Sequence, residues 1–429
     1  MPELNPLPRH WPGGGRVIIA FSGGPDSLCL LHSILAADCS REVVCLHVDH
    51  GLDSESSDRA QQAQALAKEA GTPCSIVQVS VDEAGSPEAA ARKARYLAVE
   101  NFMKPGDVVV TAHHADDQIE TVMMRLFRGA GPTGLAGIPR QRTFGRGWLV
   151  RPLLDWSRAD ILRQLEQYKL SGVEDPANSS LAFDRNYLRQ KVLPSVMSRW
   201  PGADRAILRT ARLCAGAART LTDIAGDDLE EHRAGDFRVN LKGTEEWTAF
   251  RLGEMLRHWC YRQGLDTPPG RRIETFIEQV VSSDDDRQPE LDWPQATIRK
   301  WRNHLWMDTK PQPVMNWEVV WCSGRVVELP QGIGRMELHG ALTPPELMLI
   351  RSGRPGESLQ PAGDRHHRSV RQLMADRGIP PWQRHYWPRL WVKGELVGVG
   401  DTWRTRELEN ALGQIGATLS WHTTLFRGC

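Results

Sequence analysis

No stretch of this sequence approaches the run of about 18 apolar residues that a membrane-spanning helix needs. Residues 1–15 also lack an apolar core of the length found in signal peptides. The 8 cysteines form no C-x-x-C pair and no metal-finger spacing, so we interpret them as reduced residues that pack in the interior. These absences predict a cytoplasmic protein that is neither exported nor inserted into a membrane.

The sequence also lacks a net charge, because 53 lysines and arginines balance 53 aspartates and glutamates. Any binding of nucleic acid must therefore come from a local patch of positive charge. Such a patch lies between Arg351 and Lys393, where eight arginines and one lysine outnumber three acidic residues and alternate with tryptophan and tyrosine. Arginine interleaved with aromatic side chains is typical of surfaces that bind RNA.

The rest of the chain is organised around the segment 17–35, whose pattern predicts a buried strand, a tight turn and the start of a helix. A β-branched apolar run, Val17 to Phe21, meets a small polar turn and then apolar residues at helical spacing. Glycine lets a ligand approach the backbone closely, and the amides of a first helical turn carry partial positive charge. We therefore expect an anion such as phosphate at the turn formed by Ser22, Gly23, Gly24, Pro25, Asp26 and Ser27.

This turn differs from two common phosphate loops, because it contains neither Gly-Lys-Ser/Thr nor the G-x-G-x-x-G spacing. A strand followed by a Gly-Gly turn also occurs in α/β proteins that bind no ligand, and from the turn alone that alternative stays open.

Strands and helices then alternate along the chain. We expect strands at 43–48, 75–81 and 107–111, and helices at 57–70 and 87–103. This alternation predicts an α/β fold with a doubly wound parallel sheet, which binds ligands at the carboxyl ends of its strands. Asp49 and His50 follow the second strand and so belong at that edge.

The segment 111–124, TAHHADDQIETVMM, is the second stretch with side chains that could bind a ligand or take part in catalysis. His113 and His114 lie in the turn after a strand. In the helix that follows, Asp116 and Glu120 share one face at i,i+4 spacing, with Asp117 beside them. Acidic residues favour helix N-termini, so a solvated helix start is one interpretation. A substrate or magnesium site and a dedicated transition-metal site are the other two.

The next segments are less regular. Residues 128–147 are rich in glycine and basic side chains, which predicts a mobile loop. We expect a strand at 148–154, a helix at 158–169 and a helix at 186–193 that Pro194 stops.

Several ordered motifs together resemble a known family. The turn Ser-Gly-Gly-Pro-Asp-Ser resembles the loop of the PP-loop ATP pyrophosphatases. The chain is also similar to bacterial tRNA(Ile)-lysidine synthetases over HVDHGL at 47–52, AHHADDQIET at 112–121, RGAGPTGLAGI at 128–138, EDPAN at 174–178 and RNYLR at 185–189. The resemblance covers about the first 195 residues and continues more weakly to the C-terminus.

The resemblance implies ligation of free L-lysine to C2 of the wobble cytidine in an isoleucine tRNA with a CAU anticodon. It implies ATP and Mg²⁺ as cofactors and two steps. The cytosine C2 oxygen attacks the α-phosphate of ATP and releases pyrophosphate, and the lysine ε-amine then displaces AMP. The lysidine that forms changes the codon read from AUG to AUA.

The same resemblance implies roles for individual residues. Asp26 would hold Mg²⁺, Gly23, Gly24 and Ser27 would contact phosphate, and the backbone near Val48 would meet adenine. Asp117 and Glu120 match the acidic residues that bind lysine. The remaining candidates are His113, which would assist at the adenylated intermediate, and Arg92 and Arg185, which would contact phosphate or nucleotide. A structural histidine and surface ion pairs are the alternatives for these three.

We expect three domains: a PP-loop catalytic domain at 1–215, a mainly helical tRNA-binding domain with connecting strands at 216–345, and a small α+β tRNA-binding domain at 346–429. The stretch 371–382 resembles the family's C-terminal pattern. It suggests Arg368, Arg371 and Arg384 as tRNA contacts, each of which alone could be an ordinary surface charge.

Two other functions stay open from the sequence. One is a PP-loop tRNA thiolase, which would need catalytic cysteines. The other is a tRNA-binding protein without turnover, which the intact Asp26 and glycines disfavour. The sequence does not determine the oligomeric state, and we keep a homodimer as an open expectation.

Overall fold

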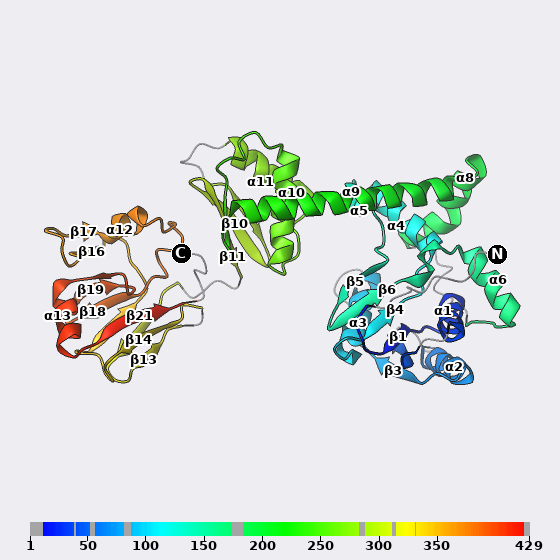
Figure 1. Cartoon of the computed structure of the whole chain (residues 1–429), viewed down its shortest axis with the longest axis horizontal. Helices are drawn as coiled ribbons and strands as arrows, with labels where there is room; N and C mark the ends of the chain where they lie inside the picture. The colour runs from blue at the N-terminus through cyan, green and yellow to red at the C-terminus, as the bar shows by residue number, and fades with distance from the viewer. Residues whose placement is uncertain are drawn as a thin grey trace. The chain divides into compact units, whose positions relative to one another are not determined.

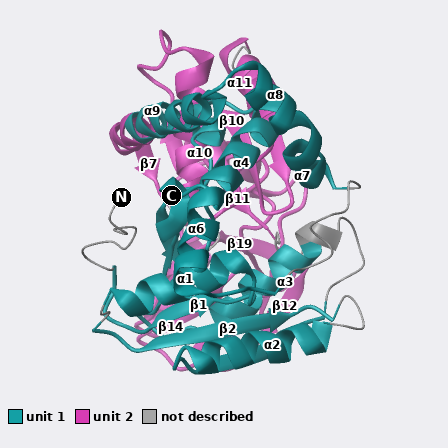
Figure 2. Ribbon diagram, turned by 90° about the vertical axis from the view of Figure 1, so that its right-hand side faces the viewer, with its two compact units in different colours: residues 1–220 teal, residues 221–429 magenta. Residues whose placement is uncertain are grey.

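The computed structural model describes residues 12–37, 40–51, 56–80, 87–173, 183–282, 288–310, 315–330 and 332–423. The chain forms two compact units, residues 1–220 and 221–429, which Figure 2 shows in different colours. The motif at 174–178 and the end of the motif at 47–52 lie outside the described residues. Among the helices described, none is both long enough and apolar enough to span a membrane.

The first unit is built on a six-stranded sheet with the strand order β3-β2-β1-β4-β6-β5. Five strands run parallel, and β5 pairs antiparallel with β6 at one edge. The predicted parallel sheet is therefore confirmed, with one antiparallel strand added. The strands are β1 (Val17–Ala20), β2 (Val43–Asp49), β3 (Cys74–Gln78), β4 (Val108–Val110), β5 (Gln141–Phe144) and β6 (Gly147–Val150).

Helices cover both faces of this sheet, as Figure 1 shows for α1 and α3. Val17 and Ile19 of β1 pack into one apolar cluster with α1 (Pro25–Ala36), α2 (Ser56–Glu69) and α6 (Arg158–Tyr168). Ile18, between them, packs into a second cluster with α3 (Pro87–Phe102). Burial on both faces explains why the strand is continuously apolar instead of alternating.

Two local predictions in this unit were wrong. The segment 128–147 is not an irregular loop, because it contains α5 (Pro132–Leu135) and β5. Arg125, on α4 (Ala115–Phe127), donates to the carbonyls of Gly134 at 2.9 Å and Gly137 at 2.7 Å, which fixes the glycine-rich chain. Hydrogen bonds between a side chain and backbone carbonyls leave no periodic pattern in the sequence, so the order of this segment could not be predicted from it.

The helix near 186–193 does not stop at Pro194. Helical structure runs through α7 (Asp184–Tyr187), a π-helical turn (Leu188–Val192) and α8 (Leu193–Arg199). Pro194 lies in the first turn of α8. Proline is tolerated in a first turn, where its missing N–H costs little.

The helix α9 (Ala203–His232) leads to a five-stranded antiparallel sheet with the order β7-β8-β11-β10-β9. Two helices, α10 (Ala249–Arg262) and α11 (Gly270–Ser282), pack on it through Trp259 and Phe276. This part therefore contains more sheet than the mainly helical domain that we expected. The strands are β7 (Arg233–Gly235), β8 (Arg238–Asn240), β9 (Glu290–Trp293), β10 (Ala296–Trp301) and β11 (His304–Thr309).

The last part holds a five-stranded sheet, β12-β15-β18-β19-β20, and a three-stranded sheet, β13-β14-β21. Strand β12 (Glu318–Trp321) pairs with β15 (Met348–Arg351). Strand β14 (Arg335–His339) pairs with β13 (Val326–Glu328) on one side and with β21 (Thr418–His422) on the other. The predicted domain limits stay a prediction, and these pairings tie residues 318–339 to the last domain. Its other elements are β16 (Ser358–Leu359), β17 (Arg368–Ser369), α12 (Val370–Asp376), β18 (Arg389–Val392), β19 (Glu395–Val399), β20 (Trp403–Arg404) and α13 (Arg406–Gln414).

Candidate active site

The glycine-rich turn lies where β1 ends and α1 begins. Gly23 has φ +81°, and a Cβ there would lie 3.0 Å from the Cβ of Ala63 on α2, so only glycine fits without strain. Gly24 is the N-cap of α1, and the Ser27 hydroxyl donates to its carbonyl at 3.0 Å. The N–H of Gly24 donates to Ser22 Oγ at 3.3 Å, so the Ser22 hydroxyl lies beside the start of α1. A glycine-rich turn at a helix N-terminus is a common place for phosphate to bind.

Asp26, in the first turn of α1, has one carboxylate oxygen without a partner. Its Oδ1 is buried, and no described residue forms a hydrogen bond with it. Burial raises the pKa of Asp26, against the positive charge of His114, whose Nε2 lies 3.7 Å from Oδ2. A buried carboxylate oxygen without a partner is the type of ligand that Mg²⁺ prefers, so Asp26 fits the predicted metal.

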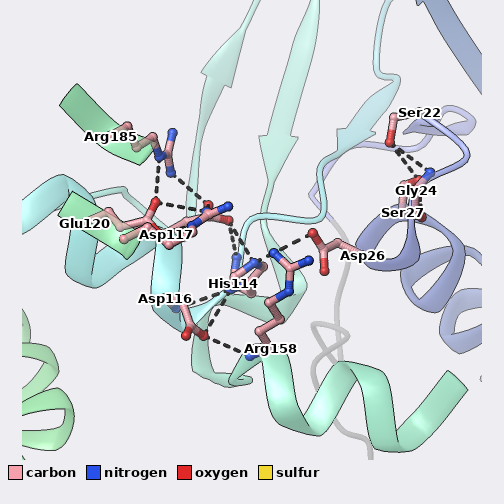
Figure 3. Close-up of polar contacts among 11 residues, drawn as sticks. Ser22, Gly24, Asp26, Ser27, His114, Asp116, Asp117, Glu120, Arg158 and Arg185 are labelled. Atoms are coloured by element: carbon pink, nitrogen blue, oxygen red, sulfur yellow. Dashed lines mark hydrogen bonds and ion pairs between the residues drawn. The ribbon is translucent and has the colours of Figure 1, made fainter. Parts of the chain in front are cut away.

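His114 lies between the turn and α4, as Figure 3 shows. The side chain is 2% exposed and approaches three carboxylates: Asp26, Asp116 at 3.3 Å and Asp117 at 3.6 Å. Burial disfavours the imidazolium, but these carboxylates outweigh it and raise the pKa of His114. From the sequence, His114 was placed in the turn without a role of its own, although a histidine at the helix start, separated by one residue from Asp116 and Asp117, was a signal.

Two arginines bind the acidic pair on α4. Glu120 is fully buried and accepts from Arg185 Nε at 2.7 Å and from Arg189 Nε at 2.5 Å. Arg185 also donates to Asp117 at 2.8 Å (Figure 3). Arg185 therefore does not form an ordinary surface ion pair, because one of its partners, Glu120, is fully buried. Arg189 was missed, although Arg185 and Arg189 share one helical face at i,i+4 spacing.

The burial of these side chains bears on the interpretations of segment 111–124. The solvated helix start is wrong, because Glu120 and His114 are buried. Within the described chain, the ligand atoms here do not gather into a three-residue transition-metal cluster. A substrate or magnesium site stays a prediction, which the burial of these side chains favours over a solvated helix start.

A cavity of about 290 Å³ joins the two stretches. His113 lies in its wall with Nδ1 at 2.8 Å from Thr111 Oγ1, and burial lowers its pKa to about 4. The guanidinium of Arg92 lies 5.2 Å from the ring centre of Tyr96. Among the predicted residues, those that line the cavity are Ser22, Asp26, Ser27, Val48, Arg92, His113, Asp117 and Arg185.

Some predicted residues do not line the cavity, and some lining residues were not predicted. Gly23, Gly24, Pro25 and Glu120 lie behind its surface. Arg95, Tyr96, Phe144 and Leu149 do line it. The last three contribute apolar surface, which from sequence alone is indistinguishable from core.

The predicted tRNA contacts belong to one region of the second unit. Arg368 pairs with Asp376 at 2.5 Å, and Arg384 Nε donates to the carbonyl of Ile379 at 2.9 Å. Burial, together with the charges of Arg371 and Arg302, lowers the pKa of Arg384. Arg371 is exposed on α12. Arg371 is thus the best placed of the three to reach a ligand in solution.

Comparison with known proteins finds three domain matches along the chain. Residues 5–196 match the PP-loop domain, residues 249–306 the TilS substrate binding domain, and residues 348–421 the TilS substrate C-terminal domain. A solved tRNA thiolase from Methanococcus maripaludis is 18% identical with a TM-score of 0.40, and covers 47% of this chain and 72% of that chain.

Two relatives carry the name tRNA(Ile)-lysidine synthase. The one from Alkalilimnicola ehrlichii is 36% identical and spans 93% of this chain and 94% of its own. The one from Methylococcus capsulatus is 34% identical, spanning 95% and 96%. With similarity of this extent and all three domain matches, the chain belongs to the tRNA(Ile)-lysidine synthase family.

Proposed function

We propose that this protein ligates lysine to C2 of the wobble cytidine in an isoleucine tRNA with a CAU anticodon. Membership of the family and the PP-loop domain support the use of ATP and of a tRNA substrate. The observation that carries the proposal is the cavity, which is lined by Ser22, Asp26 and Ser27 of the glycine-rich turn and by Asp117 of α4. Such a cavity suits a nucleotide and a cationic amino acid together.

The first step makes cytosine reactive. Its C2 oxygen attacks the α-phosphate of ATP, the bond to the β-phosphate breaks, and pyrophosphate leaves. Ser22 and Ser27 line the cavity and would hold the phosphates, with the amides of Gly23 and Gly24 beside them. Mg²⁺, held by Asp26, would offset the negative charge that grows on them. Arg92 and Val48 line the cavity where the nucleotide would lie.

In the second step, the lysine ε-amine attacks C2 and AMP leaves with the C2 oxygen. The ε-ammonium of free lysine has a pKa of about 10.4, so it is protonated at pH 7 and must lose a proton before the amine attacks. His113 lines the same cavity, and its pKa of about 4 makes it neutral at pH 7 but too weak a base to take the proton of an ammonium. It would therefore orient the amine, and the phosphate of the departing AMP would take the proton.

We assign different tasks to the two acids. Asp117 lines the cavity and would contact lysine directly. Glu120 does not line it, and both of its oxygens bind arginine. Its task would be to hold Arg185, and through Arg185 to orient Asp117.

The reaction is tested with purified protein, ATP, Mg²⁺, labelled lysine and an isoleucine tRNA transcript bearing CAU. We expect label in the RNA and release of AMP, both lost when the wobble cytidine is replaced. Asp26→Ala should abolish adenylation and leave tRNA binding nearly unchanged. Equal turnover in that variant would overturn the magnesium assignment.

Release of pyrophosphate without incorporation of lysine would instead favour a thiolase. The described cysteines give that alternative no support. None lines the cavity, and burial raises the pKa of Cys29 to about 11, far from that of a reactive thiol. A cytoplasmic location and a homodimer stay predictions.

A further inference from the structure

A second cluster of chemical side chains lies far along the chain from the cavity, on the three-stranded sheet β13-β14-β21. Figure 1 shows these strands side by side. Met336 and Leu338 of β14 and Leu419 of β21 point inward and are buried. Because side chains alternate along a strand, Glu337 and His339 face outward on β14, and His422 faces outward on β21.

These three side chains converge on one point. His422 Nε2 lies 3.4 Å from Glu337 Oε2, and His339 Nδ1 lies 3.9 Å from Glu337 Oε1. One ligand atom from each residue fits within 4.8 Å of the others. Two ligands at about 2.1 Å on one tetrahedral zinc ion lie about 3.4 Å apart. Small side-chain rotations would therefore bring all three onto one ion.

We propose that Glu337, His339 and His422 bind a divalent transition-metal ion of the zinc class. Two imidazoles and one carboxylate suit Zn²⁺ or Ni²⁺ better than Mg²⁺ or Ca²⁺, which prefer ligand sets made of oxygen alone. Three protein ligands leave at least one position for water.

Ser420 lies between the two histidines and orients His339, while its contact with His422 Nε2 would be replaced when that nitrogen binds the ion. Its hydroxyl lies 2.8 Å from His339 Nε2 and 3.0 Å from His422 Nε2. If His339 binds the ion through Nδ1, the hydrogen bond from Nε2 to Ser420 persists and fixes the ring. Such supporting hydrogen bonds orient metal-binding histidines in proteins.

One neighbour competes with the ion. Arg335 Nη2 lies 3.7 Å from Glu337 Oε2, and its side chain is half exposed. A long, exposed ion pair contributes little, so it does not prevent a dication from binding Glu337. Binding would bridge β14 and β21, the last strand that the structure describes, and so fasten the end of the fold.

The test is equilibrium dialysis of the full chain, stripped with EDTA, against micromolar ZnCl₂, with bound zinc counted by mass spectrometry. We expect His339→Ala/His422→Ala to bind one equivalent less than the wild type. The matched control is His366→Ala/His367→Ala, which removes two exposed histidines elsewhere and should bind as much as the wild type.

Outward-facing substitutions leave the buried face of the sheet intact, and circular dichroism checks that both variants fold. Glu337→Gln keeps the size of the side chain and should weaken the site at least tenfold, whereas Arg335→Ala should bind at least as tightly as the wild type. Equal zinc binding by the wild type and the double histidine variant would overturn the proposal. So would a wild type that binds no zinc. Neither result would affect the proposed ligation of lysine.

Discussion

Two neighbouring aspartates allow direct contact with lysine to be tested against a general effect of negative charge. Asp117 borders the cavity, whereas its neighbour Asp116 binds the backbone N–H of Arg158 at 2.8 Å and is not part of the lining. We expect Asp117→Asn to raise the KM for lysine more than tenfold, since a charge-assisted hydrogen bond contributes about 1.5–3 kcal/mol. Steady-state kinetics with varied lysine measures this.

Asp116→Asn is the matched control, because it removes an equal charge one residue away. We expect its KM for lysine to stay within about threefold of the wild type. Similar effects of both variants would mean that general negative charge attracts lysine, and would contradict direct contact by Asp117.

His113 provides a test of protonation. Burial lowers its pKa to about 4, so the folded protein keeps this imidazole neutral from about pH 5.5 upward. We expect its NMR resonances to stay constant between pH 5.5 and 8, with His113→Asn used to assign them. A transition of His113 near pH 6.5 would exclude the buried, neutral form.

At the scale of elements, the chain after α6 supports the glycine-rich turn. Val173 donates its N–H to the carbonyl of Gly23 at 2.9 Å. A Cβ on Gly172 would lie 2.5 Å from the backbone nitrogen of Pro25 and 2.8 Å from the carbonyl carbon of Gly24. Because both are backbone atoms, the turn itself would have to shift.

We therefore expect Gly172→Ala to raise the KM for ATP at least tenfold while circular dichroism stays close to that of the wild type. The control is Gly216→Ala in α9, where a Cβ meets no atom within 4 Å. Alanine there favours the helix by about 0.5–1 kcal/mol. An unchanged KM for ATP in Gly172→Ala would show that the turn does not need this support.

At the scale of the whole molecule, the neutral total charge hides a basic region that the fold only partly exposes. Arg389 is 4% exposed and bound to Glu357, and Arg368 is paired with Asp376. The basic count of the sequence thus overstates the charge available to RNA. Arg371 is exposed on α12 and carries the clearest prediction.

Arg371→Ala should weaken tRNA binding and reduce the slope of log K against log salt by about 0.7–0.9, the value for one lost phosphate contact. Filter binding at several salt concentrations measures both quantities. Arg406→Ala, an exposed arginine on α13, is the control and should change neither. An Arg371 variant with unaltered affinity at all salt concentrations would remove this residue from the tRNA surface.

Local patterns in the sequence were enough for the centre of the catalytic unit. The β-branched run at 17–20, the glycine turn and the start of α1 follow from burial, turn chemistry and helix spacing, which neighbouring residues determine. The carboxyl ends of parallel strands meet at one edge, so the alternation of strands and helices was enough to predict that the segments after β1, β2 and β4 lie together.

Tertiary structure alone decided which distant groups meet. Arg189 binds Glu120 across 69 positions, and β14 pairs with β21 across about 80, while β5 joins an edge from a glycine-rich segment. No short-range period records such partners, because they depend on which surfaces chain closure brings together. The sequence by itself therefore determined the glycine-rich turn and the family, whereas the fold decided that Glu120 holds arginine and that His339 and His422 share one face.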